Sequence, residues 1–149
     1  MAILSSETLH ATAVSIKGQG VLIEGVSGAG KSDLALRLID RGAVLISDDY
    51  SFVQRRNGHV IASPPATIAG KIEVRGVGII EMPHVTETPV ALLVALGEAV
   101  ARLPEPGHVR CLLGIDIPLL ALDGREASAP VKVELSLSQL VLSQLGLPA

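Results

Sequence analysis

The chain has 149 residues, 48% hydrophobic and 18% charged, which is enough for one domain with a core and excludes a disordered segment. Its formal net charge of -3 gives no general attraction for nucleic acid or an anionic membrane, so we expect neither partner. The single cysteine, Cys111, excludes an intramolecular disulfide and a Cys-rich metal site, and fits a reducing, cytoplasmic compartment.

The hydrophobic residues predict an aliphatic core. Their distribution along the chain predicts neither a signal peptide nor a membrane span. There is no tryptophan, one tyrosine and one phenylalanine, and Cys111 is expected to be a buried apolar residue. The N-terminus, MAILSSETLHATAV, has no basic stretch of the kind that begins a signal peptide. The most apolar segment, VALLVALGEAVA, is broken by Gly97 and Glu98 before the ~20 residues that a membrane span needs.

The first half of the chain alternates strands with a loop and a helix. Residues 12–16 and 21–24 have strand patterns on either side of KGQG and predict a hairpin. From Ser32, SDLALRLIDR has helical spacing and predicts a helix of about ten residues that Gly42 ends. AVLIS, from Ala43, then predicts a buried strand. The succession of strand, loop, helix and strand predicts an α/β fold.

The second half is predicted to be mainly β. Residues 51–63 predict a hairpin around Asn57-Gly58, which Pro64-Pro65 ends. Residues 70–81, GKIEVRGVGIIE, predict one strand beside mobile loops. Further strands are expected at 90–95, 109–113, 117–122 and 131–137, and the tail SLSQLVLSQLG predicts a short amphipathic helix.

A phosphate-binding loop follows the first hairpin. GVSGAGKS, from Gly25 to Ser32, completes the pattern G-x-x-x-x-G-K-[ST] between a predicted strand and a predicted helix. Its glycines let backbone N–H groups approach phosphate oxygens, Lys31 adds a positive charge, and the Ser32 hydroxyl is a magnesium ligand. The loop predicts binding of nucleotide phosphates and Mg²⁺ through Gly25, Ser27, Gly28, Ala29, Gly30, Lys31 and Ser32, and leaves open whether the protein is an ATPase, a GTPase or a kinase. The alternative is a glycine-rich turn that binds nothing.

Acidic residues follow the strand that comes after the loop's helix. Asp48 and Asp49 lie where that strand ends, and open α/β sheets bind ligands at the carboxyl ends of their strands. Such a pair can hold magnesium or accept a proton from an attacking hydroxyl. A solvated turn capped by aspartates is the alternative.

Other polar residues have less specific patterns. Glu73 and Arg75 alternate with apolar residues and share one face of a strand, which fits a half-exposed strand as well as a ligand site. His10 lies in no local motif, and from its pattern alone a structural histidine is the expected interpretation.

Several of these segments, in this order, resemble the catalytic domain of the HPr kinase/phosphorylase family of the bacterial sugar phosphotransferase system. The resemblance runs from about His10 to Glu134 and rests on His10, the loop and its helix, LISDD, the two prolines, and above all IEVRGVGII from Ile72. It implies a P-loop nucleotide-binding fold with a central mixed sheet, like that shared by HPr kinases and PEP carboxykinases.

The resemblance also implies an activity. Members of the family transfer the γ-phosphate of ATP to a serine of the small carrier protein HPr, and remove it with inorganic phosphate to give pyrophosphate. We therefore expect a serine kinase, and also a phosphorylase, that acts on HPr or an HPr-like carrier and regulates carbon metabolism. Longer relatives are hexamers, so a homo-oligomer is expected.

Site residues follow from the resemblance position by position. Asp48 resembles the family's acid/base residue and Asp49 has a supporting role in the metal site. Glu73 resembles the second magnesium-site residue beside Ser32, and His10 resembles the active-site histidine, which replaces the structural interpretation above. Arg102 resembles an arginine that favours dephosphorylation. Lys31 completes the catalytic set.

The chain departs from the family pattern in three places. It starts nine residues before His10 and is expected to be a short form, with residues 1–149 as a single kinase domain and no N-terminal regulatory domain. Val26 stands where the loop usually has an aspartate, which should leave nucleotide binding intact. The residues after Leu137 are too few for the basic C-terminal helix that engages HPr in long members.

Two other functions remain open on these residues. A nucleotide-binding sensor would bind ATP and couple it to a partner with little catalysis, although it would need fewer acids than Asp48, Glu73 and His10 provide. A kinase of another substrate, such as a small molecule, would normally have an arginine-rich lid, and Arg55-Arg56 is too short for one.

Overall fold

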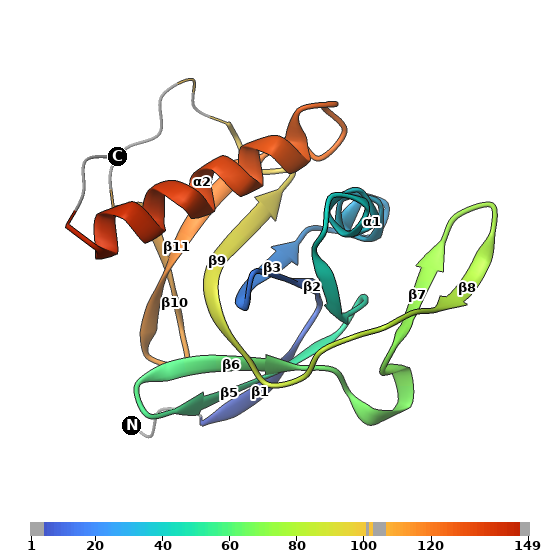
Figure 1. Cartoon of the computed structure of the whole chain (residues 1–149), viewed down its shortest axis with the longest axis horizontal. Helices are drawn as coiled ribbons and strands as arrows, with labels where there is room; N and C mark the ends of the chain where they lie inside the picture. Colours follow the sequence, from blue (N-terminus) through green and yellow to red (C-terminus); the bar gives the residue numbers. More distant parts are fainter. Residues whose placement is uncertain (1–4, 101, 103–106, 147–149) are drawn as a thin grey trace.

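A strongly curled mixed sheet contains nine of the eleven strands of the described residues (Figure 1). The computed structural model describes residues 5–100, 102 and 107–146. In this part of the chain, the strand order is β1-β5-β6-β9-β3-β2-β4, and β11 pairs with both β9 and β10. The strands of this sheet are β1 (Ser6–Leu9), β2 (Ala11–Ile16), β3 (Gln19–Glu24), β4 (Val44–Ser47), β5 (Ser51–Arg56), β6 (His59–Ser63), β9 (Thr88–Leu96), β10 (Val109–Leu112) and β11 (Ile115–Leu122).

The strand directions bring several loops to one edge of the sheet. β9 pairs parallel with β3 and β11, whereas β2 is antiparallel to both of its neighbours, β3 and β4. β3, β4, β9 and β11 therefore all run the same way. Their carboxyl ends meet at one edge, which is where α/β sheets place ligands.

The core lies on both faces of the central strands. Along β3, Val21 and Ile23 pack into the cluster beneath the helices, while Leu22 packs into the cluster on the opposite face. On β9, Leu92 packs into the cluster beneath the helices and Leu93 into the cluster on the opposite face. Strands buried on both faces read as continuous apolar runs, which is why these segments were recognisable from the sequence.

The elements around the phosphate-binding loop agree with the sequence prediction. The hairpin is β2 and β3, and the loop leads into α1 (Lys31–Asp40), which buries Leu34, Ala35 and Leu38. Gly42 has φ 111, the left-handed conformation expected just after a helix. The mixed α/β fold is confirmed.

The strand predicted at residues 131–137 is wrong. These residues belong to α2 (Ala129–Gln144), which packs on the same face of the sheet as α1 (Figure 1). Val131, Val133, Leu135 and Leu137 alternate along the sequence and so mimic a strand. The helix instead buries Ala129, Val133 and Leu137 at four-residue spacing, with Pro130 in its first turn, where proline is favoured.

Other expectations need smaller corrections. Residues 70–81 form a separate hairpin of β7 (Lys71–Val74) and β8 (Gly78–Glu81), because the chain turns at Arg75–Val77. A short helix, η1 (Ala66–Ile68), precedes it. Cys111 is exposed, because it lies on β10 at the end of the sheet order. β1 was not predicted.

None of the helices in the described ranges has both the length and the apolar character that a membrane crossing requires.

Gly20 provides a test of the central sheet. A Cβ at this position would lie 2.9 Å from the carbonyl oxygen of Pro89, since β3 and β9 are closely paired there. We expect Gly20→Ala to lower the free energy of unfolding by roughly 1–3 kcal/mol, the usual cost of overpacking. Urea denaturation measures it. Gln19→Ala, on the neighbouring residue, is the control, and equal effects of the two changes would contradict the close-approach explanation.

Candidate active site

The phosphate-binding loop connects β3 to α1 at the common edge of the parallel strands. Gly28 and Gly30 have φ 84 and 95, a backbone conformation that side chains disfavour. Gly25 meets a different constraint, because an added Cβ would lie 3.1 Å from the Cβ of Leu96 on β9. The glycines thus shape the loop and let it lie against the sheet.

Lys31 begins α1 and folds back over the loop. Its ammonium donates to the carbonyl oxygens of Gly25 at 2.8 Å and Val26 at 3.3 Å, and the residue is only 6% exposed. These carbonyls satisfy a charge that burial would otherwise penalise. A bound phosphate can replace them as the partner of the ammonium, because phosphate oxygens are stronger, charged acceptors.

Asp48 lies at the floor of the site and is held by groups from three other elements. Its Oδ1 accepts from the Ser32 hydroxyl of α1 at 2.6 Å and from the Thr12 hydroxyl of β2 at 3.2 Å. Its Oδ2 accepts from the backbone N–H of Glu73 on β7 at 2.9 Å. Asp48 is 7% exposed, and these hydrogen bonds replace the water that it loses on burial.

Asp49 faces a different partner. It has φ 65, a left-handed conformation that aspartate tolerates better than most residues. Its Oδ1 lies 2.8 Å from Nε2 of His10, and the His10 ring stacks on Tyr50 with centroids 4.9 Å apart. The backbone N–H of Asp49 donates to the Thr12 hydroxyl at 3.0 Å. The two aspartates therefore serve different contacts.

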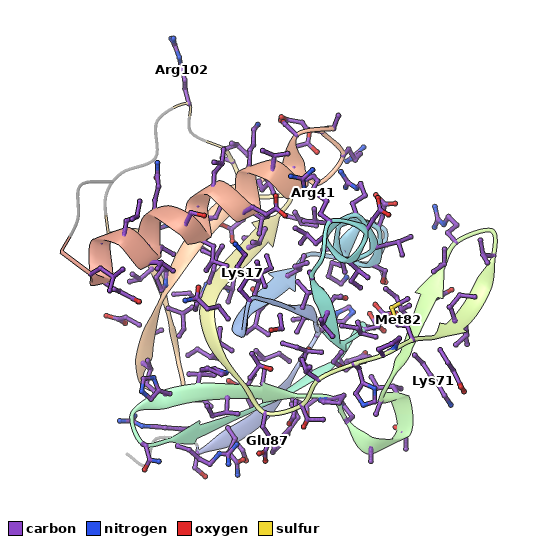
Figure 2. All side chains as sticks on the ribbon, viewed as in Figure 1. Lys17, Arg41, Lys71, Met82, Glu87 and Arg102 are labelled. Atoms are coloured by element: carbon purple, nitrogen blue, oxygen red, sulfur yellow. The ribbon has the colours of Figure 1, made fainter. Side chains whose placement is uncertain are left out.

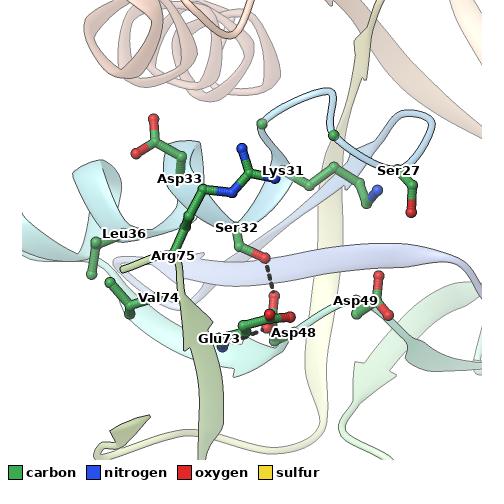
Figure 3. Close-up of a pocket in the computed structure, with 12 residues that line it drawn as sticks. Ser27, Lys31, Ser32, Asp33, Leu36, Asp48, Asp49, Glu73, Val74 and Arg75 are labelled. Atoms are coloured by element: carbon green, nitrogen blue, oxygen red, sulfur yellow. Dashed lines mark hydrogen bonds between the residues drawn. The ribbon is translucent and has the colours of Figure 1, made fainter. Parts of the chain in front are cut away.

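These elements enclose a pocket of about 540 Å³ between the loop and the β7–β8 hairpin (Figure 3). Figure 3 shows Lys31 and Arg75 on the loop side, and Asp48, Asp49 and Glu73 on the opposite side. The pocket also has Ser27, Gly28, Gly30, Ser32, Asp33, Leu36 and Val74 in its lining. The cationic side chains therefore lie on the side of the pocket where a phosphate chain would bind. The carboxylates lie on the opposite side, where they could bind a metal ion or accept a proton from a hydroxyl.

Most of the predicted site residues come together in this pocket. Gly25 and Ala29 belong to the loop without lining the pocket, and His10 reaches it only through Asp49. Arg102 does not line the pocket: it lies between β9 and β10, and its side chain projects outward beyond α2 (Figure 2). The catalytic role of Arg102 stays a prediction.

The sequence interpretation missed Thr12 as a site residue. Thr12 is fully buried, and its hydroxyl links Asp48 to the backbone of Asp49. A polar residue within the apolar run ATAV was the available signal, because a buried hydroxyl needs a partner. The sequence predicted Arg75 on the same strand face as Glu73. It did not predict the hairpin turn, which is what brings Arg75 into the pocket.

Comparison with known proteins adds independent information on this arrangement. The family described as the HPr serine kinase C-terminal domain matches residues 2–127. The chain belongs to the HPr serine kinase C-terminal domain family. This agrees with the resemblance inferred from the sequence, and with the P-loop fold that it implies.

Individual members of the family are similar to parts of the chain. HPr kinase/phosphorylase of Clostridium tetani is 47% identical over 81 residues, 54% of this chain but 27% of the relative. The enzyme of the same name from Mycoplasmopsis pulmonis is 45% identical over 74 residues and is covered to 24%. The chain therefore matches about a quarter of the length of these curated relatives.

A solved structure extends the similarity over nearly the whole chain. The HPr(Ser) kinase/phosphatase of Coxiella burnetii superposes with a TM-score of 0.78 at 29% identity. The match covers 93% of this chain and 98% of the other. The curled sheet and its helices are thus a fold that this family shares.

The hydroxyl of Thr12 should contribute measurably to stability. Thr12→Val keeps the shape but leaves Asp48 and the N–H of Asp49 with one fewer partner, so we expect a loss of roughly 1–3 kcal/mol in the free energy of unfolding. Chemical denaturation checks this. Thr12→Ser keeps the hydroxyl and should recover most of the loss; a serine variant as unstable as the valine variant would show that packing of the methyl group matters instead.

Proposed function

We propose that this protein is an ATP-dependent serine kinase, and also a phosphorylase, that acts on HPr or an HPr-like phosphocarrier. Residues 1–149 would work as one P-loop kinase unit. The observation that carries the proposal is the position of the Asp48 carboxylate, which lies in one pocket with Lys31 and hydrogen-bonds Ser32. Membership of the HPr serine kinase C-terminal domain family supports this carrier as the substrate.

The loop would hold ATP by its phosphates. Backbone N–H groups at the start of α1 and the Lys31 ammonium would bind the β- and γ-phosphate oxygens, with Lys31 exchanging its carbonyl partners for them. Most of the catalysis would come from this positioning and charge neutralisation. Val26 is 77% exposed, so its side chain does not disturb the backbone N–H groups or the Lys31 ammonium.

Asp48 would act as the acid and base of the transfer. In the forward direction its carboxylate accepts the proton of the serine hydroxyl, the oxygen bonds to the γ-phosphorus, and the bond between the β- and γ-phosphates breaks to release ADP. In reverse, phosphate loses a proton to Asp48 and attacks the phosphoserine. Pyrophosphate then leaves and the serine oxygen regains the proton. His10 would orient Asp49 beside this site.

The oxygen ligands of the pocket fit Mg²⁺ as the cofactor. Within the described ranges, no group of three or more His, Cys, Asp and Glu side chains could hold a metal by itself. This suits magnesium, which usually takes one or two carboxylates and completes its coordination with substrate phosphates and water. Ser32 and Glu73 would hold it, with support from Asp49. The ion would neutralise negative charge on the phosphates during transfer.

Two substitutions separate nucleotide binding from transfer. Lys31→Ala should abolish both, because the phosphate charge is left without its counter-charge. Asp48→Asn is close in shape and should still bind ATP, while transfer falls by about 10² to 10⁴-fold, the usual contribution of a general base. Transfer is measured with γ-labelled Mg-ATP and the host's HPr-type carriers, and ATP binding by calorimetry.

The carrier supplies the control for this assay. Changing its candidate serine to alanine should remove the label, and inorganic phosphate added to the labelled carrier should release labelled pyrophosphate. A wild-type protein that binds ATP but labels no carrier would instead favour a nucleotide sensor or another substrate. Unchanged transfer by Asp48→Asn would overturn the role of that residue.

Glu73 tests the metal site. Glu73→Gln removes a negative ligand but keeps the backbone N–H that holds Asp48. We expect the Mg²⁺ concentration for half-maximal transfer to rise by about tenfold, since loss of a metal-site partner typically costs about 10- to 100-fold in metal affinity or activity. Glu81→Gln, the same change on the same hairpin but outside the pocket, is the control. The same Mg²⁺ dependence in wild type and Glu73→Gln would exclude Glu73 as a ligand.

A further inference from the structure

The ring of Tyr50 lies against a residue of the candidate site. Tyr50 is 47% exposed and belongs to neither of the two core clusters. It stacks on the ring of His10, with centroids 4.9 Å apart and an angle of 23° between the ring planes. A stack of this kind fixes how two rings face each other, in addition to the area that it buries. The ring of Tyr50 is therefore placed to act on His10.

Strand pairing brings these two rings together. β1 and β5 are antiparallel, and Leu9 opposite Ser51 is their last pair. His10 and Tyr50 are the next residues on the two sides, so they face each other just beyond the paired strands, where aromatic side chains interact. The Ser51 hydroxyl also donates to the carbonyl oxygen of Ala11 at 2.8 Å, which holds the chain on the other side of His10. The register of the sheet thus determines the stack.

The backbone of Tyr50 closes a tight turn around Asp49. Its N–H donates to the carbonyl oxygen of Asp48 at 2.7 Å, across Asp49 with φ 65. A hydrogen bond between residues two apart, across a residue of positive φ, belongs to the rare and strained form of γ-turn. The Ser47 hydroxyl donates to the carbonyl oxygen of Tyr50, and the N–H of the central residue donates to the Thr12 hydroxyl. These hydrogen bonds fix the direction in which the Asp49 side chain leaves the backbone.

His10 holds one oxygen of the Asp49 carboxylate. Nε2 of His10 lies 2.8 Å from Oδ1 of Asp49. An ionised carboxylate only accepts hydrogen bonds, so Nε2 carries the proton in this contact. Among the residues that the structure describes, none makes a hydrogen bond with Oδ2, and Asp49 lines the pocket (Figure 3). The second carboxylate oxygen is thus available to a ligand.

The rotation of the His10 ring needs a restraint. The torsion that turns a histidine ring has a broad distribution, and the His10 side chain is 42% exposed, so core packing does not fix it. A ring turned out of its present plane would move Nε2 away from Asp49. Stacking on Tyr50 fixes the plane of the ring, and the hydrogen bond with Asp49 selects which edge of the ring faces the carboxylate.

We propose that Tyr50 is a positioning residue of the active site. Its ring fixes the plane of the His10 ring, so that Nε2 holds Oδ1 of Asp49 and leaves Oδ2 for a ligand in the pocket. Tyr50 does not line the pocket, so it acts through His10 and Asp49 without touching the substrate. The ring is the part required, since phenylalanine offers the same face for stacking. The importance of this arrangement for phosphoryl transfer rests on the proposed function.

The first experiment observes His10 by NMR spectroscopy at alkaline pH, where imidazole is neutral. In the wild-type protein, the ring current of Tyr50 should shift the ring protons of His10 upfield, and Nε2 should be the protonated nitrogen. Tyr50→Phe should keep both signatures. Tyr50→Leu should lose the ring-current shift and show a mixture of the two neutral tautomers. His10→Gln identifies the signals, because it removes one of the four histidines.

The matched control is Phe52→Leu, which removes the chain's one phenylalanine, two residues further on and outside the pocket. It should leave the His10 signals as they are in the wild type. Circular dichroism shows which variants are folded, and Tyr50→Gln is a second variant without a ring that suits an exposed position. Wild-type His10 signals in a folded Tyr50→Leu or Tyr50→Gln protein would overturn the proposal. So would a Tyr50→Phe protein whose His10 signals match those of Tyr50→Leu.

The second experiment uses the transfer assay with γ-labelled Mg-ATP. Tyr50→Leu should lower kcat by about tenfold, within the loss of up to about 10²-fold that a small misplacement at a site causes. The KM for Mg-ATP should stay unchanged, since Lys31 and the loop keep their contacts, and Tyr50→Phe should recover kcat. A wild-type kcat in Tyr50→Leu would contradict a role in transfer. A wild-type protein without any transfer would instead count against the proposed function, and the NMR comparison would still decide whether Tyr50 positions His10.

Discussion

The burial of one carboxylate shapes the whole site. Asp48 accepts hydrogen bonds from β2, α1 and β7, so elements that are distant in the sequence must meet at its two oxygens. A buried carboxylate without such partners is strongly unfavourable, and this requirement fixes where the β7–β8 hairpin can stand relative to the loop. The pocket is the space that these constraints leave.

The position of β2 between β3 and β4 determines how Asp48 is placed relative to the phosphate-binding loop. β3 and β4 run the same way, and the antiparallel β2 separates the loop from Asp48 by one strand. This spacing leaves room for Ser32 at the start of α1 to reach Asp48 from above. It also places a strand under both groups: Thr12 on β2 supports Asp48, and His10, just before β2, approaches Asp49.

Site residues could be predicted from the sequence where their positions depend on residues close by in the chain. The loop, α1 and Asp48 lie within 24 residues and use glycine, capping and apolar patterns that act over a few positions, so they were predictable. Thr12 was missed because its role depends on strand pairing with β4, which no local pattern encodes. Similarly, the hairpin turn at residues 75–77 decides that Arg75 enters the pocket.

The fold was predictable to the same extent and for the same reason. Strands buried on both faces carry continuous apolar runs that are hard to mistake. The segment of α2 was mistaken because apolar residues at alternate positions also satisfy a helix when both of its faces are apolar. An ambiguous period was thus a sign of a helix with apolar residues both in the core and on its exposed side.

The scarcity of aromatic residues gives the molecule an unusual optical property. Tyr50 is the only tyrosine and there is no tryptophan, and Tyr50 stacks on His10 next to Asp49. The chain's one intrinsic fluorophore of any strength therefore stands at the edge of the pocket, and the core contributes none. Ultraviolet emission from this protein therefore originates beside the pocket, so that ligand binding there is open to study with no added label.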